Sequence, residues 1–159
     1  MKPSLCRLAS LAVLLAAVAG GSSEARPPKD SSAVVKASAE AGKADADGKQ
    51  TVTVTLVIDK SWHVYANPVG LQDLVDAQTV VTFAAKEPVR VLKLDYPPGK
   101  SMPDKVLGSD YKVYEDRAEI KAVVQRAKGD ASPLEATVAV QACNDRTCLF
   151  PARLKATAP

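Results

Sequence analysis

Two cysteines near the end of the chain, Cys143 and Cys148, have the spacing of a pair that can exchange electrons. They bracket four polar residues, Asn-Asp-Arg-Thr, and apolar runs lie on both sides of this turn. The pattern predicts a β-hairpin in which the two sulfurs lie on adjacent strands. A disulfide there closes a loop of only about six residues and contributes roughly 2 kcal/mol, against about 4 to 5 kcal/mol for a bridge across 100 residues.

The residues alone are compatible with three different functions of this cysteine pair. A locally closed, exposed bridge suits thiol–disulfide exchange, because strained bridges between strands are reduced more easily. The same bridge can instead serve only to rigidify a hairpin in a secreted β-sandwich binding module. A third use is periplasmic copper handling with Cys143, Cys148, His63 and Met102, since soft sulfur ligands suit copper.

The single histidine of the chain, His63, excludes metal centres built from several histidines. It belongs to a short alternating run, residues 62–66, in which His63 and Tyr65 share one face of the expected strand. We expect His63 to be a surface or hydrogen-bonded side chain, with a place beside the cysteines as the alternative. For Tyr65, a role in the core or an interface and a role in lining the cysteines are equally compatible with the pattern.

The first residues have the features of an export signal. A short positive start precedes the apolar run 8–19, which is too short to span a membrane, and Ala17-Val18-Ala19 offers a cleavage site before Gly20. We therefore expect a signal peptide over residues 1–19, with cleavage as late as residue 25, and a flexible leader over 20–31. Cleavage removes Lys2, Arg7 and Cys6, so the formal charge falls from +3 to +1 and two cysteines remain. An even pair in an exported protein is typical of a disulfide, and we expect no membrane insertion after cleavage.

The rest of the chain has the pattern of an all-β protein. Runs rich in Val, Thr and Ala recur between turn residues at the spacing of about 8–12 residues that is typical of a sandwich. Residues 70–77 have room only for a helical turn or two, and residues 97–110 are expected to be irregular. Interspersed charges of both signs exclude a basic nucleic-acid surface. The expected strands are about nine: 34–41, 51–58, 62–66, 78–84, 89–96, 112–114, 117–127, 134–142 and 149–156.

Three stretches together resemble the N-terminal periplasmic domain of DsbD, the membrane thiol–disulfide interchange protein. They are the cysteine hairpin VQACNDRTCLFP (140–151), the segment SWHVYANPVG (61–70), and YPPGK (96–100) followed by KVYEDR (112–117). The motifs stand in the family's order, and the similarity covers about residues 32–157. The resemblance implies an immunoglobulin-like β-sandwich over these residues and a dithiol that relays electrons without a bound cofactor.

The resemblance also implies roles for single residues. Cys148 would form the mixed disulfides with partners and Cys143 would resolve them. Tyr65 corresponds to an aromatic residue beside the cysteines, and we expect His63 to line the site with it. In the family a cap loop shields the pair. Here that loop is 97–110, and Val106 and Leu107 lie nearest to the place of its shielding phenylalanine.

The chain departs from the family in three ways. Its cap contains no phenylalanine, and the turn between the cysteines is one residue shorter than in well-studied members. It also lacks the transmembrane electron carrier and the thioredoxin-like Cys-x-x-Cys domain. We therefore expect a periplasmic thiol–disulfide oxidoreductase module that depends on a separate membrane electron transporter as donor and acts on thioredoxin-like oxidoreductases. The sequence leaves open whether the electrons serve disulfide correction or cytochrome c maturation.

Overall fold

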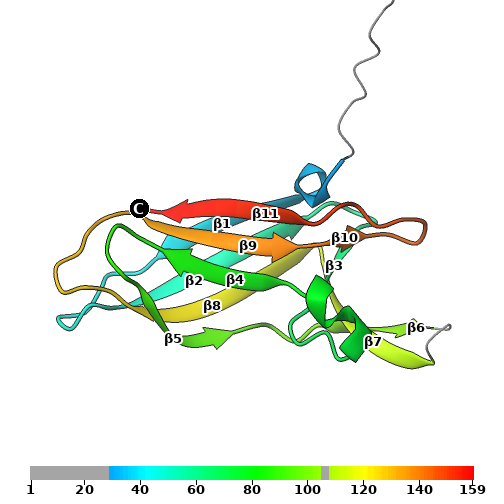
Figure 1. Ribbon diagram of the computed structural model, residues 1–159, viewed down its shortest axis with the longest axis horizontal. Coiled ribbons are helices and arrows are strands. Elements are labelled where there is room, and N and C mark those ends of the chain that lie inside the picture. The colour runs from blue at the N-terminus through cyan, green and yellow to red at the C-terminus, as the bar shows by residue number, and fades with distance from the viewer. Residues whose placement is uncertain (1–28, 105–107) are drawn as a thin grey trace, which may run out of the picture.

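The computed structural model describes residues 29–104 and 108–159, and antiparallel strands make up most of the regular structure of this part of the chain (Figure 1). Two short 3-10 helices are present, η1 (Ser31–Ala33) and η2 (Gln72–Ala77). The strands are β1 (Val35–Ala41), β2 (Lys49–Ile58), β3 (His63–Tyr65), β4 (Val80–Ala84), β5 (Arg90–Asp95), β6 (Lys100–Asp104), β7 (Ser109–Glu115), β8 (Arg117–Gln125), β9 (Leu134–Val140), β10 (Ala142–Cys143) and β11 (Ala152–Ala158).

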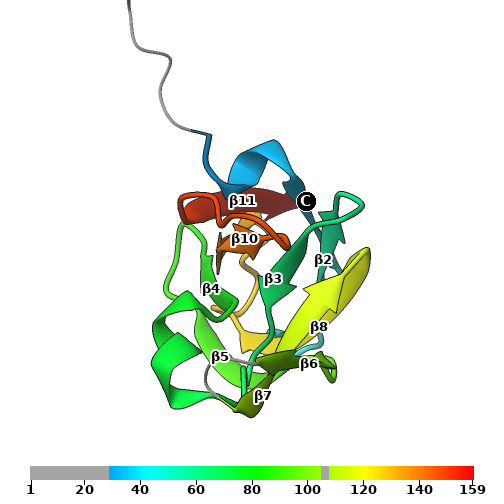
Figure 2. The ribbon, with the colours of Figure 1, turned by 90° about the vertical axis from the view of Figure 1, so that its right-hand side faces the viewer.

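The strands form three sheets. One has the order β1-β2-β8-β5, a second has the order β11-β9-β4, and residues of these two share one apolar core. The third, β10-β3-β7-β6, lies at the end of the molecule that faces the viewer in Figure 2. This arrangement confirms the all-β class and is consistent with an immunoglobulin-like sandwich.

The core follows from the alternation along the central strands, which only Thr55 on β2, itself buried, interrupts. On β2 and β8 every second residue is buried, and the same holds on β9 and β11. Because the chain has few aromatic residues, small and branched aliphatic side chains fill this space. The buried members on these four strands are Val52, Val54, Leu56, Ile58, Ala118, Ile120, Ala122, Val124, Leu134, Ala136, Val138, Val140, Ala152, Leu154, Ala156 and Ala158.

Three expectations about the elements need correction. The stretch 97–110 is not irregular, because β6 lies within it and pairs with β7 from Lys100↔Val113 to Asp104↔Ser109. The strand expected over 134–142 is two strands, since β9 pairs with β11 whereas β10 pairs with β3. The last strand begins at Ala152 rather than at residue 149. The short helix expected over 70–77 is present as η2.

A β-bulge causes the last two differences. Val140 pairs with Ala152, while further along the hairpin the Leu149 amide donates to the Ala142 carbonyl at 2.9 Å. Between these two pairings Gln141 on one strand faces two residues on the other, Phe150 and Pro151. Such a bulge bends the strand that carries it, and here the ladder changes from the main sandwich to the third sheet.

Ser31 stabilises the backbone at this bulge through its side chain. Its side chain is fully buried and accepts a hydrogen bond from the Ala142 amide at 2.9 Å while its hydroxyl donates to the Phe150 carbonyl at 2.8 Å. Its own amide donates to the same carbonyl at 2.8 Å. Backbone groups that lose a ladder partner at the bulge are thereby satisfied from the N-terminal segment.

The expected signal peptide and most of the expected leader lie outside the described residues, as do Val106 and Leu107. The boundaries drawn at residues 19, 31 and 157 stay predictions. Within the described part of the chain, no helix has the length and apolar character needed to cross a membrane.

Ser31→Ala should destabilise the protein by about 2 kcal/mol, because it leaves the buried Ala142 amide without an acceptor. The matched control is Ser32→Ala, which removes only an exposed hydrogen bond to Asp30 and should change the free energy of unfolding by less than about 0.5 kcal/mol. Urea unfolding of both oxidised variants measures the difference. Equal stabilities for the two variants would contradict the role of Ser31.

Candidate functional site

Cys143 and Cys148 form a disulfide across the expected hairpin. The sulfurs are 2.07 Å apart and the Cα atoms 4.0 Å apart. The turn between them is closed by the Asn144 amide, which donates to the Thr147 carbonyl at 2.9 Å. The Asn144 side-chain oxygen accepts from the amides of Arg146 and Thr147 at 2.9 and 3.0 Å. The hairpin predicted from the spacing of the cysteines is therefore confirmed.

The two cysteines differ sharply in access to solvent. Cys143 lies on β10 and is only 3% exposed, whereas Cys148 is an exposed residue on the outer arm of the hairpin. In Figure 1 the turn that joins them projects from the right-hand end of the molecule. An incoming sulfur therefore meets Cys148 first.

A row of four residues crosses the third sheet through the disulfide. Cys148 is the cross-strand partner of Cys143, Cys143 that of His63, and His63 that of Glu115. Direct partners in antiparallel pairs place their side chains on one face, so all four point to the same side of the sheet. Neighbouring strands lie about 4.8 Å apart, which places His63 roughly 10 Å from Cys148.

Tyr65 contacts the buried sulfur. Its hydroxyl lies 3.5 Å from Cys143 Sγ, and because a disulfide sulfur carries no proton, the tyrosine is the donor. Burial raises the pKa of Tyr65, with further contributions from Tyr111 and Asp104, so the hydroxyl keeps its proton at neutral pH. The Tyr111 ring on β7 packs against Tyr65 at 5.8 Å between ring centroids.

The side chain of His63 is neither exposed nor hydrogen-bonded, which corrects the expectation of a surface or hydrogen-bonded histidine. It is 8% exposed, its ring lies edge-on to Tyr65 at 6.2 Å, and no hydrogen-bond partner for it occurs among residues 29–104 and 108–159. Burial lowers the pKa of the imidazole, while the carboxylates of Glu115 and Asp145 raise it in part. The imidazole is therefore neutral at pH 7.

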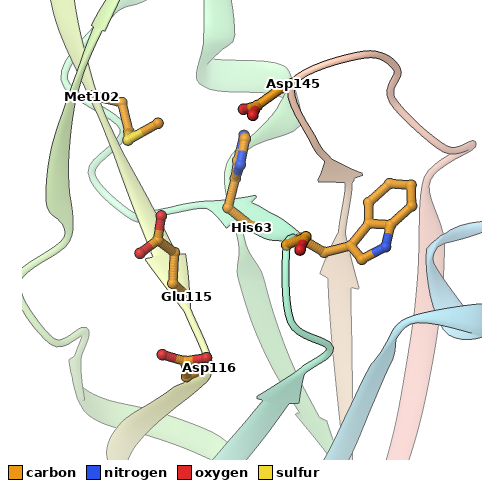
Figure 3. Close-up of a pocket in the computed structure, with 7 residues that line it drawn as sticks. His63, Met102, Glu115, Asp116 and Asp145 are labelled. Atoms are coloured by element: carbon orange, nitrogen blue, oxygen red, sulfur yellow. The ribbon is translucent and has the colours of Figure 1, made fainter.

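The imidazole lines a pocket of about 300 Å³ beside the disulfide (Figure 3). Figure 3 shows the ring directed towards the carboxylate of Asp145, with Glu115 and Met102 across the pocket. The complete lining comprises Ser61, Trp62, His63, Met102, Glu115, Asp116 and Asp145. Glu115, Asp116 and Asp145 had no signal in the sequence, because they reach His63 only through the pairing of distant strands and the cysteine turn.

The remaining expected site residues are placed as follows. Met102 lies on β6 and shares the pocket with His63, but the two cysteines that would complete a copper site are joined to each other. Over the described residues no three His, Cys, Asp or Glu side chains are arranged to hold a metal ion. The stretch expected to form the cap contains β6 and the start of β7, and Val106 and Leu107 lie outside the described residues.

Comparisons with known proteins agree with the resemblance seen in the sequence. The family described as "Thiol:disulfide interchange protein DsbD, N-terminal" matches residues 31–158. The reduced N-terminal domain of DsbD from Neisseria meningitidis is 20% identical, with a TM-score of 0.49 over 78% of this chain and 82% of that chain. The same domain in a complex with the N-terminal domain of PilB is 18% identical, with a TM-score of 0.47 over 75% and 79%.

A further solved structure shares the fold. The N-terminal periplasmic domain of ScsB from Proteus mirabilis is 12% identical, with a TM-score of 0.51 over 77% of this chain and 45% of that chain. No curated protein sequence matches the chain.

The pKa of His63 measured in the folded protein should lie below the ordinary value of 6.5, because burial disfavours the charged ring. The stability contributed by the neutral ring is then complete above pH 6.5 and is lost as the pH falls below that value, since the unfolded chain binds the proton more readily. Proton NMR reads this titration without ambiguity in a chain with one histidine.

Asp145→Asn should lower the pKa of His63 further, because it removes a carboxylate that favours the charged ring. Asp47→Asn removes the same charge from an exposed loop between β1 and β2, at the opposite end of the molecule, and should leave the titration unchanged (Figure 1). A pKa at or above 6.5, or equal shifts in both variants, would overturn this account of the pocket.

Proposed function

The chain belongs to the family of DsbD N-terminal domains, and on this basis we propose that it relays electrons through Cys143 and Cys148 between thioredoxin-like oxidoreductases. The Cys143–Cys148 disulfide and the family together make the chain a thiol–disulfide exchange module. The relay is the further step, and a separate membrane electron transporter is its proposed donor.

The observation that carries this proposal is the unequal exposure of the two sulfur-bearing residues. A disulfide that only stabilises a fold gains nothing from an exposed half, whereas exchange needs one sulfur that a partner can reach. Cys148 meets this requirement, and Cys143, at 3% exposed, does not. Because the bridge closes a loop of only six residues, it also contributes little to the stability of the fold.

The proposed reaction has two steps in each direction. In the reduced protein the Cys148 thiolate attacks a partner disulfide, which forms a mixed disulfide and releases one partner thiolate. The Cys143 thiolate then attacks Cys148 Sγ and releases the second partner thiolate, so that two electrons have passed to the partner and the Cys143–Cys148 bond is restored. During reduction by a donor the steps reverse, and Cys143 becomes the leaving thiolate.

Tyr65 is suited to assist the step in which charge develops on Cys143. That sulfur is buried, so its thiolate form needs a donor in place of water. The Tyr65 hydroxyl, 3.5 Å from the sulfur, is a donor in position to supply this hydrogen bond.

The partners and the location follow from the family. The solved complex of a DsbD N-terminal domain with the PilB N-terminal domain shows that a relative binds another protein domain, and thioredoxin-like proteins of the periplasm are the proposed counterparts here. The expected signal peptide supports the same compartment.

Single cysteine variants should separate the two roles. Cys148→Ala should abolish mixed-disulfide formation with thioredoxin-like proteins, because the exposed nucleophile is lost. Cys143→Ala should accumulate the mixed disulfide, because nothing resolves it. Non-reducing electrophoresis of each variant after incubation with an oxidised thioredoxin measures the adduct. Equal amounts of adduct from both variants would count against these roles.

The reduction potential of the pair should lie between about −120 and −270 mV, the range of thioredoxin-like oxidoreductases. Equilibration with a dithiol buffer series, read by the mass shift on thiol alkylation, measures it. A reduction potential below about −300 mV would instead identify a structural bridge, and the chain would then be a binding module with a rigid hairpin.

Tyr65→Phe should slow resolution of the mixed disulfide about tenfold, because it removes one hydrogen bond to a developing thiolate and keeps the ring. The matched control is Tyr111→Phe, because among the described residues only the Tyr65 hydroxyl makes a hydrogen bond to a cysteine sulfur. Quenched-flow alkylation measures the lifetime of the adduct. If both variants resolve at the same rate, the Tyr65 hydroxyl has no part in the reaction.

A further inference from the structure

The pocket beside the disulfide combines negative charge with a largely buried histidine, whose side chain has no hydrogen-bond partner among the described residues. Glu115, Asp116 and Asp145 line it, and the ammonium of Lys100 lies 2.8 Å from Glu115 Oε2. Asp116 and Asp145 take part in no ion pair within the described part of the chain. The pocket therefore keeps an excess of negative charge.

His63 adds an independent sign that something binds there. More than nine-tenths of this residue is buried, no described residue hydrogen-bonds to it, and Figure 3 shows its ring aimed into the pocket. Since no described side-chain nitrogen or oxygen is both fully buried and without a hydrogen-bond partner, the unpaired ring nitrogens of His63 reach the solvent in the pocket and are available to a ligand. Because the ring is neutral at pH 7, one of its nitrogens accepts a hydrogen bond.

We infer that this pocket binds one arginine side chain of the protein that docks on the disulfide. The inference rests on the proposed function, since it names the partner's contact at the same site. A guanidinium has five N–H donors and no acceptor, which matches a lining of carboxylates and one imidazole acceptor.

The position of the pocket suits a docking contact. His63 and Glu115 share the face of the sheet with the disulfide, and Asp145 belongs to the turn that joins the cysteines. The pocket therefore lies roughly 10 Å from Cys148, within reach of a residue that flanks an attacking sulfur. Its volume of about 300 Å³ is at the lower limit for small-molecule sites, which favours a single side chain over a larger ligand.

The first test uses Nα-acetyl-arginine amide as probe and its neutral isostere, Nα-acetyl-citrulline amide, as control. Titrated into the oxidised protein, the arginine amide should shift the His63 imidazole resonance saturably, with a Kd of about 1 mM, and the citrulline amide should not. Asp145→Asn and Glu115→Gln should each weaken binding about fivefold or more, and Asp47→Asn should leave it unchanged. Equal responses to both amides, or no saturable response, would overturn the inference.

Arg146 is the internal alternative, because it lines a neighbouring hollow with Ser61, Asn144 and Asp145. Arg146→Gln should bind the arginine amide as the parent protein does. Binding that appears only in Arg146→Gln would show that the chain's own arginine fills the pocket, and would overturn the assignment to a partner.

A second test measures exchange itself. The reduced protein is mixed with two short cysteine peptides, activated as thionitrobenzoate disulfides, that differ only in arginine or citrulline near the cysteine. The arginine peptide should react about fivefold faster, and the ratio should fall towards one in Asp145→Asn but not in Asp47→Asn. Equal rates for the two peptides would refute the pocket inference alone. Failure of both peptides to react, with arginine amide still bound, would refute the exchange function and leave the pocket standing.

Discussion

The disulfide hairpin depends on a constraint that lies at the other end of the chain, the buried hydroxyl of Ser31. The ladder between β9 and β11 breaks where Gln141 faces Phe150 and Pro151, and backbone groups at this break need partners that the sheet no longer supplies. Ser31 supplies them through hydrogen bonds to Ala142 and Phe150. Because the break is satisfied, the hairpin leaves the main sandwich and carries its cysteines to the third sheet, where β3 and β7 provide the surroundings of the site.

This change of sheet explains why two cysteines five residues apart have such different environments. Cys143 remains within the ladder, paired with His63 on one side and with Cys148 on the other, so it is buried and lies under the Tyr65 hydroxyl. Cys148 is on the outer arm, which has no further strand beside it among the described residues. In the proposed relay, the exposed position suits the sulfur that a partner must reach, and the buried position suits the sulfur that resolves the mixed disulfide.

The regular part of the fold was predictable because its physics is local. Alternation along β2, β8, β9 and β11 identifies the buried faces, and the polar turn between two apolar runs identifies the cysteine hairpin. The pairing of His63 and Tyr65 on one face also follows from the period of a strand. The bulge, the role of Ser31 and the strand β6 were missed, because each depends on a partner distant in sequence. Burial of His63 was missed for the same reason, since Glu115 pairs with it across the sheet and Cys143 pairs with it on the other side.

An exposed Cys148 does not by itself distinguish one partner disulfide from another, and the surroundings of the site can supply this selectivity. Access alone makes a thiol reactive towards any disulfide that collides with it, so selectivity must come from contacts made beside the sulfur. The acidic pocket lies on the same face and includes Asp145 from the cysteine turn itself. Charge complementarity at such a position governs which partner orients productively more than how tightly it stays. A relay must release each partner after two electrons have passed, so a charged contact that guides docking without holding the product suits this chemistry better than a large apolar interface.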